Sequence, residues 1–187
     1  MGQFYSNYTL RGPSQQDVAS ALAGRSAFVT PAQNGCVVAY DEASEAQDFA
    51  IISELGARLS LQFSCPVLAA VVHDDDILFF QLYEGGEVTD DYDSSPGYFD
   101  SDAEPSAPDG GDAVRLCAAF GTSNVQEVST ILRKSTYDDD GPDAAERHNH
   151  LVRALGLSPW AVGAGYGYIA EGEVPDGLSE AQLLKTQ

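Results

Sequence analysis

The residues best suited to chemistry are carboxylates grouped around a predicted β-hairpin. Asp74 and Asp76 belong to an acidic turn between two apolar segments, and Asp93 ends the strand that follows Gly85-Gly86. If those two glycines form the whole turn, Asp76 and Asp93 lie diagonally on one face, roughly 7–8 Å apart at Cα. Oxygen ligands of this kind bind Ca²⁺ or Mg²⁺. The pattern predicts a divalent-cation site formed by Asp74, Asp76 and Asp93, with solvated turn acids as the alternative.

Aromatic residues accompany these carboxylates in a segment shaped by proline and glycine. Exposed aromatic side chains in an acidic setting are typical of protein interfaces. The alternative is that the rings fold back and anchor the loop on the sheet. The predicted interface consists of Tyr83, Asp91, Tyr92, Tyr98 and Phe99.

Two other motifs do not support a cofactor or catalytic site. The run Gly163-Ala-Gly165-Tyr-Gly167 is followed by an aromatic, strand-like tract, whereas a dinucleotide fingerprint requires a helix there. His148 and His150 are two residues apart, so on a helix they point about 200° apart and cannot share a metal. The sequence contains no G-x-S-x-G nucleophile motif. We therefore predict no catalytic and no cofactor-binding residue.

The charge of the chain restricts its partners. The formal net charge is -20, and 13 of the 29 acidic residues lie between Leu59 and Val114, a stretch without Lys or Arg. Such a surface repels phosphate backbones and anionic lipids, which argues against nucleic acid and membranes as partners. It suits a basic protein partner, and the alternative is that the charge serves only solubility.

Length and cysteine content indicate one cytoplasmic domain. A chain of 187 residues with 43% hydrophobic residues fits a single domain over 1–187. The longest apolar run, 67–72, has the length of a strand and cannot span a bilayer. Cys36, Cys65 and Cys117 are odd in number and lack the paired spacing of a zinc site, so we expect free thiols in a reducing compartment.

Hydrophobic periodicity predicts an α+β fold. The first six elements follow the order β-α-β-β-α-β, which is the ferredoxin-like pattern, and a hairpin extends that sheet. We expect an antiparallel or mixed sheet of about six or seven strands, with helices mainly on one face. Ser44 and Gln47 predict a capping box for the second helix. After a loop at 94–112 we expect helices at 113–120, 125–134, 144–155 and 178–184, and a strand at 160–169.

Two segments resemble a group of uncharacterised bacterial proteins of about this length. They are HDDDILFFQLYEGGEVTDDYDSSPGYF at 73–99 and ALGLSPWAVGAGYGYIAEGEVPDG at 154–177. The resemblance implies a bacterial cytosolic protein and transfers no functional residue.

The sequence as a whole favours a non-enzymatic binding or regulatory module with an acidic face for a protein partner. The alternatives are a divalent-cation or small-molecule binder, and an enzyme without a recognisable motif.

Overall fold

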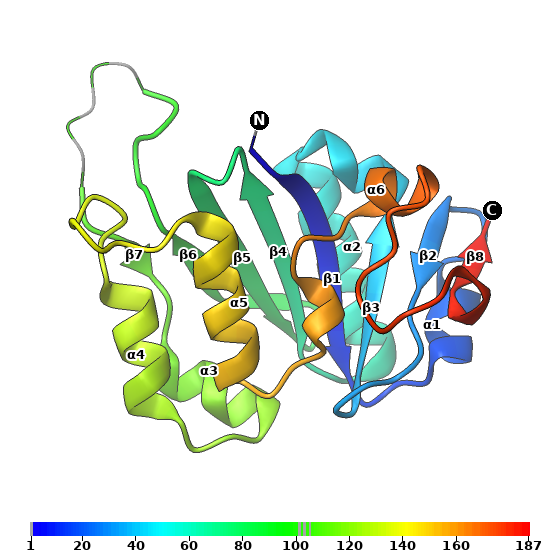
Figure 1. Ribbon diagram of the computed structural model, residues 1–187. Coiled ribbons are helices and arrows are strands. Elements are labelled where there is room, and N and C mark those ends of the chain that lie inside the picture. The colour runs from blue at the N-terminus through cyan, green and yellow to red at the C-terminus, as the bar shows by residue number, and fades with distance from the viewer. Residues whose placement is uncertain (1, 101, 103, 105) are drawn as a thin grey trace.

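The protein is built on one eight-stranded sheet with the strand order β7-β6-β5-β4-β1-β3-β2-β8 (Figure 1). The computed structural model describes residues 2–100, 102, 104 and 106–187. Every neighbouring pair of strands is antiparallel. The strands are β1 (Phe4–Arg11), β2 (Ala27–Val29), β3 (Cys36–Asp41), β4 (Val67–His73), β5 (Ile77–Glu84), β6 (Glu87–Asp93), β7 (Asp109–Gly110) and β8 (Leu184–Thr186).

Within the described residues, six helices and three 3₁₀ turns accompany the sheet. The helices are α1 (Gln15–Ala21), α2 (Phe49–Phe63), α3 (Ala113–Phe120), α4 (Val125–Arg133), α5 (Ala144–Ala154) and α6 (Tyr166–Ala170). The 3₁₀ turns are η1 (Glu42–Ala46), η2 (Pro159–Ala161) and η3 (Glu180–Gln182). Within the part of the chain that the structure describes, each helix is too short or too polar to cross a membrane.

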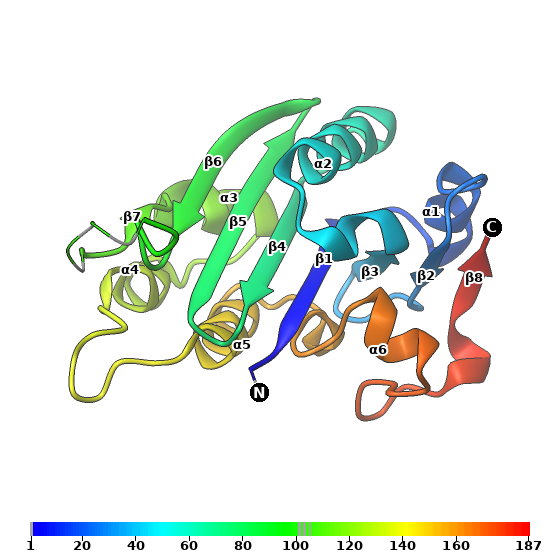
Figure 2. The ribbon, with the colours of Figure 1, turned by 90° about the horizontal axis from the view of Figure 1, so that it is seen from above.

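The helices cover both faces of the sheet, so the expectation of helices mainly on one face is wrong. Figure 2 shows α1 and α2 on one side and α5 and α6 on the other. One hydrophobic core lies on the side of α1 and α2. A separate core lies on the side of α5 and α6 and also contains residues of α3 and α4. The central strands explain the two layers, because β3 and nearly all of β4 are buried on both faces and need apolar cover on each.

The start of α2 differs from the predicted capping box. Asp48 caps the helix by accepting from the Ala50 N–H at 2.8 Å. Ser44 lies earlier, within η1, where it is buried and bonded to Asp41. Gln47 adopts a left-handed conformation (φ 55°), which ends η1 and separates it from α2. The buried polar contact of Ser44 therefore overrides its local preference for a helix cap.

A β-bulge shifts the register of the β5–β6 hairpin by one residue. Tyr83 pairs with Val88, but Leu82 pairs with Asp90, so Thr89 is left over. Beyond the bulge Phe79 pairs with Asp93, whereas a two-residue turn without a bulge predicts Leu78 opposite Asp93. The shift places Asp93 on the α2 side of the sheet, the side of Phe79.

The C-terminal segment also departs from expectation. The predicted strand at 160–169 is wrong, because η2 and α6 occupy this segment. The side-chain amide of Asn7 on β1 donates to the carbonyls of Ala161 and Ala164. These bonds hold the segment against a face of the sheet, so it does not add a strand to the sheet's edge. The predicted terminal helix at 178–184 is only the short turn η3, and β8 then pairs with β2.

Candidate functional site

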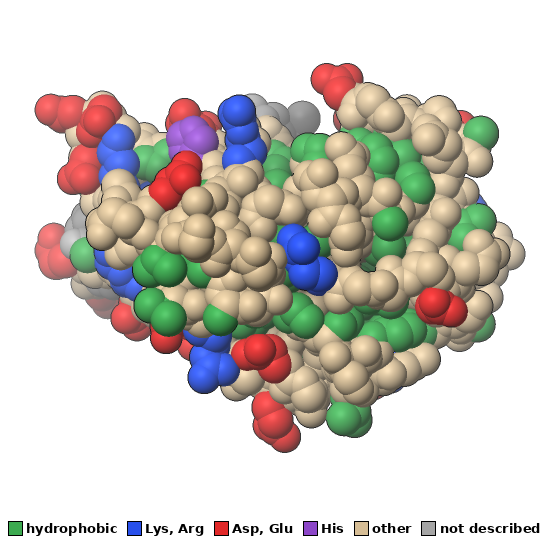
Figure 3. Space-filling view, turned by 90° about the horizontal axis from the view of Figure 1, so that it is seen from below, with side chains coloured by type: hydrophobic (Ala, Val, Ile, Leu, Met, Phe, Trp, Pro, Cys, Tyr) green, Lys and Arg blue, Asp and Glu red, His purple; other side chains and the backbone are tan. Residues whose placement is uncertain are grey.

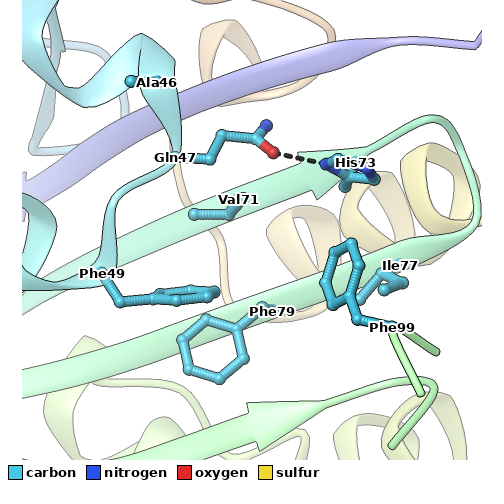
Figure 4. A pocket seen from close by; sticks show the side chains of 8 residues that line it. All are labelled: Ala46, Gln47, Phe49, Val71, His73, Ile77, Phe79 and Phe99. Atoms are coloured by element: carbon cyan, nitrogen blue, oxygen red, sulfur yellow. Dashed lines mark hydrogen bonds between the residues drawn. The ribbon is translucent and has the colours of Figure 1, made fainter. Parts of the chain in front are cut away.

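An aromatic hollow opens on the α2 side of the sheet, between the start of α2 and the loop that follows β6 (Figure 4). Its volume is about 180 Å³. The side chains of β4 and β5 form its floor, and the beginning of α2 and Phe99 form its walls. The residues that line the aromatic hollow are Ala46, Gln47, Phe49, Val71, His73, Ile77, Phe79 and Phe99.

Gln47 fixes the wall formed by the start of α2. Its Nε2 donates to the Val72 carbonyl at 2.9 Å, and its Oε1 lies 2.7 Å from His73 Nδ1. Because an amide oxygen only accepts, His73 Nδ1 carries a proton and donates to it. In neutral His73 the Nε2 atom is therefore the acceptor. The two bonds hold the Gln47 side chain against Val72 and His73 at the end of β4.

Three aromatic rings lie close to the His73 ring. Its ring centroid lies 4.7 Å from that of Phe4, 5.1 Å from Phe99 and 6.2 Å from Tyr98, with edge-on geometry in each case. Phe49 and Phe79 make a similar contact at 4.6 Å on the other side of the hollow. Much of this aromatic surface faces solvent, because Phe49 is 44% and Phe99 is 72% exposed.

The wall that carries Phe99 is anchored by polar contacts. The Tyr98 hydroxyl donates to Asp76 Oδ2 at 2.7 Å, and this bond to a carboxylate raises the pKa of Tyr98 to about 12. The Ser95 N–H donates to Asp93 Oδ1 at 2.8 Å, and the Ser94 N–H donates to the Leu78 carbonyl at 3.0 Å. The loop is thus joined to the acidic turn and to both strands of the hairpin.

A pair of carboxylates adjoins the floor of the hollow. Asp93 on β6 pairs with Phe79 on one side and with Asp109 of β7 on the other. Directly opposed residues of antiparallel strands point to the same face. Burial raises the pKa of Asp93, and the nearby Asp109 carboxylate raises it further, against the lowering effect of the bond from Ser95.

Among the described residues, no Lys or Arg forms an ion pair with Asp93 or Asp109. The four ion pairs found among the described residues involve the carboxylates of Asp41, Glu84, Glu146 and Asp140. Arg133, which packs beside β7, donates to the carbonyls of Pro108, Gly110 and Gly111. Lys and Arg side chains do appear at the end of the molecule opposite the hollow, where Figure 3 shows them among acidic and apolar groups.

The predicted metal ligands do not converge. Asp74 accepts from the Gly2 N–H at 3.0 Å, Asp76 from Tyr98 and Asp93 from Ser95. Among the residues that the structure describes, no group of three or more His, Cys, Asp or Glu could hold a metal ion. The cation site stays a prediction to which this arrangement adds no support.

The predicted interface residues fall into two sets. Tyr98 is 39% exposed, Phe99 is more exposed, and Asp91 is also at the surface. Tyr83 and Tyr92 are 0% and 1% exposed, so neither can meet a partner in this conformation. The two helical layers cover both rings, and the bulge turns Tyr92 to the side of α4, where its hydroxyl donates to the Leu132 carbonyl at 3.0 Å.

The buried side chains of Tyr5 and His148 form a structural contact. The Tyr5 hydroxyl lies 2.9 Å from His148 Nδ1, and the two join β1 to α5. Burial lowers the pKa of His148 to about 4 and raises the pKa of Tyr5. Both side chains are closed to solvent at 1% exposure, so we do not assign them to a binding site.

Gln47, Phe49 and Phe79 were not identified as site residues from the sequence. Phe49 has the spacing of the apolar stripe of α2, and Phe79 belongs to an apolar strand, so each resembles a core residue. The sequence feature that could have identified Phe49 is Asp48, a preferred N-cap residue, which places Phe49 in the exposed first turn of α2.

Comparisons with protein-family models, curated proteins and solved structures found no match to this chain.

Proposed function

We propose that this chain is a non-enzymatic binding module that recognises a basic protein partner through the aromatic hollow and the adjacent carboxylates. The observation that carries the proposal is the combination of exposed rings with two acids that form no ion pair within the described part of the chain. Phe49 and Phe99 stand at the rim, and Asp93 and Asp109 continue the floor.

Apolar burial supplies the expected affinity of such a contact. Full burial of a Phe side chain contributes roughly 1.5–3 kcal/mol, and covering the exposed part of Phe49 or Phe99 contributes a fraction of that. Aromatic residues also dominate the energetic centres of protein interfaces. The net charge of -20 adds attraction to a basic surface, which speeds association and disfavours acidic partners. Binding through this surface should therefore weaken as salt concentration rises.

The size of the hollow favours a side chain over a free small molecule. Its volume is about 180 Å³. Sites for drug-sized ligands measure roughly 300–1,000 Å³. A cavity of the smaller size holds one side chain of a partner, while the rest of the interface spreads over the neighbouring surface.

A random peptide library selected against the wild-type chain tests this proposal. Peptides enriched on the wild type should bind the Phe49→Ser/Phe99→Ser variant at least ten-fold more weakly, because both exposed rings are lost. The Leu61→Ser/Val114→Ser variant is the matched control, since these apolar side chains are each 64% exposed and do not line the hollow. It should retain full affinity.

Two results would contradict the proposal. One is a selection that enriches no peptide on the wild type. The other is a set of peptides that bind the Phe49→Ser/Phe99→Ser variant and the wild type equally well.

Two structural assignments accompany the functional one. We propose that the first six elements form a ferredoxin-like unit, supported by the strand order β4-β1-β3-β2 and by α1 and α2 on the same face. We propose a cytoplasmic location, supported by Cys36, Cys65 and Cys117, which are free thiols. A protease-protection assay on intact cells would test the location.

A further inference from the structure

One row of side chains crosses the sheet from the hollow to its acidic margin. Val71 on β4 pairs with Phe79 on β5, Phe79 pairs with Asp93 on β6, and Asp93 pairs with Asp109 on β7. Directly paired residues share a face, and neighbouring strands lie about 4.8 Å apart. Asp93 therefore lies one strand spacing from Phe79 in the floor of the hollow, and Asp109 lies two strand spacings from it.

The two carboxylates are in an unfavourable position without a ligand. Like charges directly opposite each other on neighbouring strands destabilise the pairing. Asp93 is also partly withdrawn from water, and burial raises its pKa. Its Oδ1 accepts from the Ser95 N–H, whereas the described residues provide no cation for either member of the pair. A cation placed between them would relieve both the repulsion and the desolvation.

We propose that the aromatic hollow and the Asp93–Asp109 pair together bind one arginine side chain of the protein partner. The aliphatic stem lies on Phe79 and Val71, and the guanidinium group reaches the two carboxylates. The inference rests on the proposed function and adds to it the residue type that is recognised and the orientation in which it enters.

Arginine fits this row better than lysine. Its planar guanidinium has five donors in a fixed fork, so it can serve two carboxylates at once, and it stacks on aromatic rings. It is also less strongly hydrated than an ammonium group, which lowers the cost of entering a partly buried site. Phe99, Phe49 and Phe79 supply the rings along its path.

Titration of the ¹⁵N-labelled chain with N-acetyl-arginine amide, followed by amide chemical shifts, tests the inference. We expect saturable shifts at Phe79, Asp93 and Asp109, and at least ten-fold weaker binding to the Asp93→Asn/Asp109→Asn variant. The Glu171→Gln/Glu173→Gln variant is the control, because it loses the same two charges from exposed residues after α6, outside the hollow. Its affinity should change less than two-fold.

Neutral and lysine analogues separate the contributions. N-acetyl-citrulline amide has nearly the shape of the arginine probe without the charge, and it should produce no saturable shift. Equal binding of N-acetyl-lysine amide would overturn the choice of arginine. Absence of saturable shifts, equal binding of citrulline, or equal weakening in both double variants would overturn the site.

Failure here is distinguishable from failure of the proposed function. Library peptides that require Phe49 and Phe99 but contain no arginine would leave the binding module standing and remove the arginine site. Library peptides whose binding falls at least ten-fold when one arginine is replaced by citrulline would support both.

Discussion

Asp41 is the last residue of β3 and Asp93 is the last residue of β6, but their carboxylates have opposite environments. Asp41 is 1% exposed, and its two oxygens accept from Arg25 Nε and Nη2, both at 2.8 Å. Its Oδ2 also accepts from the Ser44 N–H at 3.1 Å and from Ser44 Oγ at 2.7 Å. Asp93 has one bond from the Ser95 N–H and faces the like charge of Asp109.

The difference shows which carboxylate has a cation partner within the fold and which has none among the described residues. A buried charge is tolerated when a cation and hydrogen bonds replace its hydration, and Asp41 meets that condition internally. Asp93 does not, yet it lies beside an exposed aromatic hollow. Asp93 has no cation partner among the described residues, and a ligand can supply one, which is why we propose recognition there.

The largest expected effect comes from removing the cation beside Asp41. Arg25→Met leaves a buried carboxylate without its counter-ion, and breaking such a pair costs about 3 kcal/mol in the free energy of unfolding. This is the lower end of the usual range, because the Arg25 side chain is 29% exposed. Urea unfolding of the variant and the wild type at pH 7 measures the loss.

Arg115→Met is the matched control for that loss. Arg115 pairs with Glu84 at 3.0 Å, but these side chains are 46% and 38% exposed. A solvent-exposed pair is worth at most about 1 kcal/mol. If both substitutions lower the free energy of unfolding equally, the internal pair of Arg25 and Asp41 stabilises the fold no more than the surface pair does.

A smaller effect is expected from Ser44→Ala. Ser44 Oγ donates to Asp41 and lies 2.7 Å from the Tyr8 hydroxyl, so its removal leaves two buried polar groups each short of a partner. A hydrogen bond to a charged group contributes about 2 kcal/mol, and we expect that loss in thermal or urea unfolding. Ser20→Ala, at an exposed position on α1, should be neutral.

The smallest effect has the opposite sign. Asp93→Asn removes the repulsion from Asp109 and should raise the free energy of unfolding at pH 7 by about 0.5 kcal/mol. The folded-state pKa of Asp93 is raised, so the wild type is destabilised once the pH rises through that value and recovers as Asp93 protonates. The advantage of the variant should therefore shrink from pH 7 to pH 4.

Urea titrations of both proteins across that pH range check the sign. An advantage that grows on acidification would mean that the Asp93 carboxylate is stabilised in the folded state. In that case the comparison with Asp41 would lose its basis.

Part of the site could be predicted from the sequence. The acidic hairpin and the exposed Tyr98 and Phe99 stand where the sequence places them, because strand periodicity and turn residues are local signals. The burial of Tyr83 and Tyr92 could not be predicted, because the helical layers that cover them, and the Thr89 bulge that sets the face of Tyr92, depend on distant packing.

Local elements and charge follow from the amino-acid sequence of this protein. Most helices and strands up to α5 occur where periodicity predicts them, and Ser14 caps α1 by accepting from the Asp17 N–H. These features depend on neighbours in the chain, so residue types and spacing are sufficient to predict them.

Which of these residues come into contact depends on the three-dimensional packing of the whole chain. The one-residue shift at Thr89 selects Asp93 as the neighbour of Phe79, and the loop after β6 brings Phe99 to His73. Strand register and loop placement minimise the free energy of the whole sheet with its two helical layers. Contacts between residues far apart in sequence carry that information, so the aromatic hollow became visible only in the folded chain.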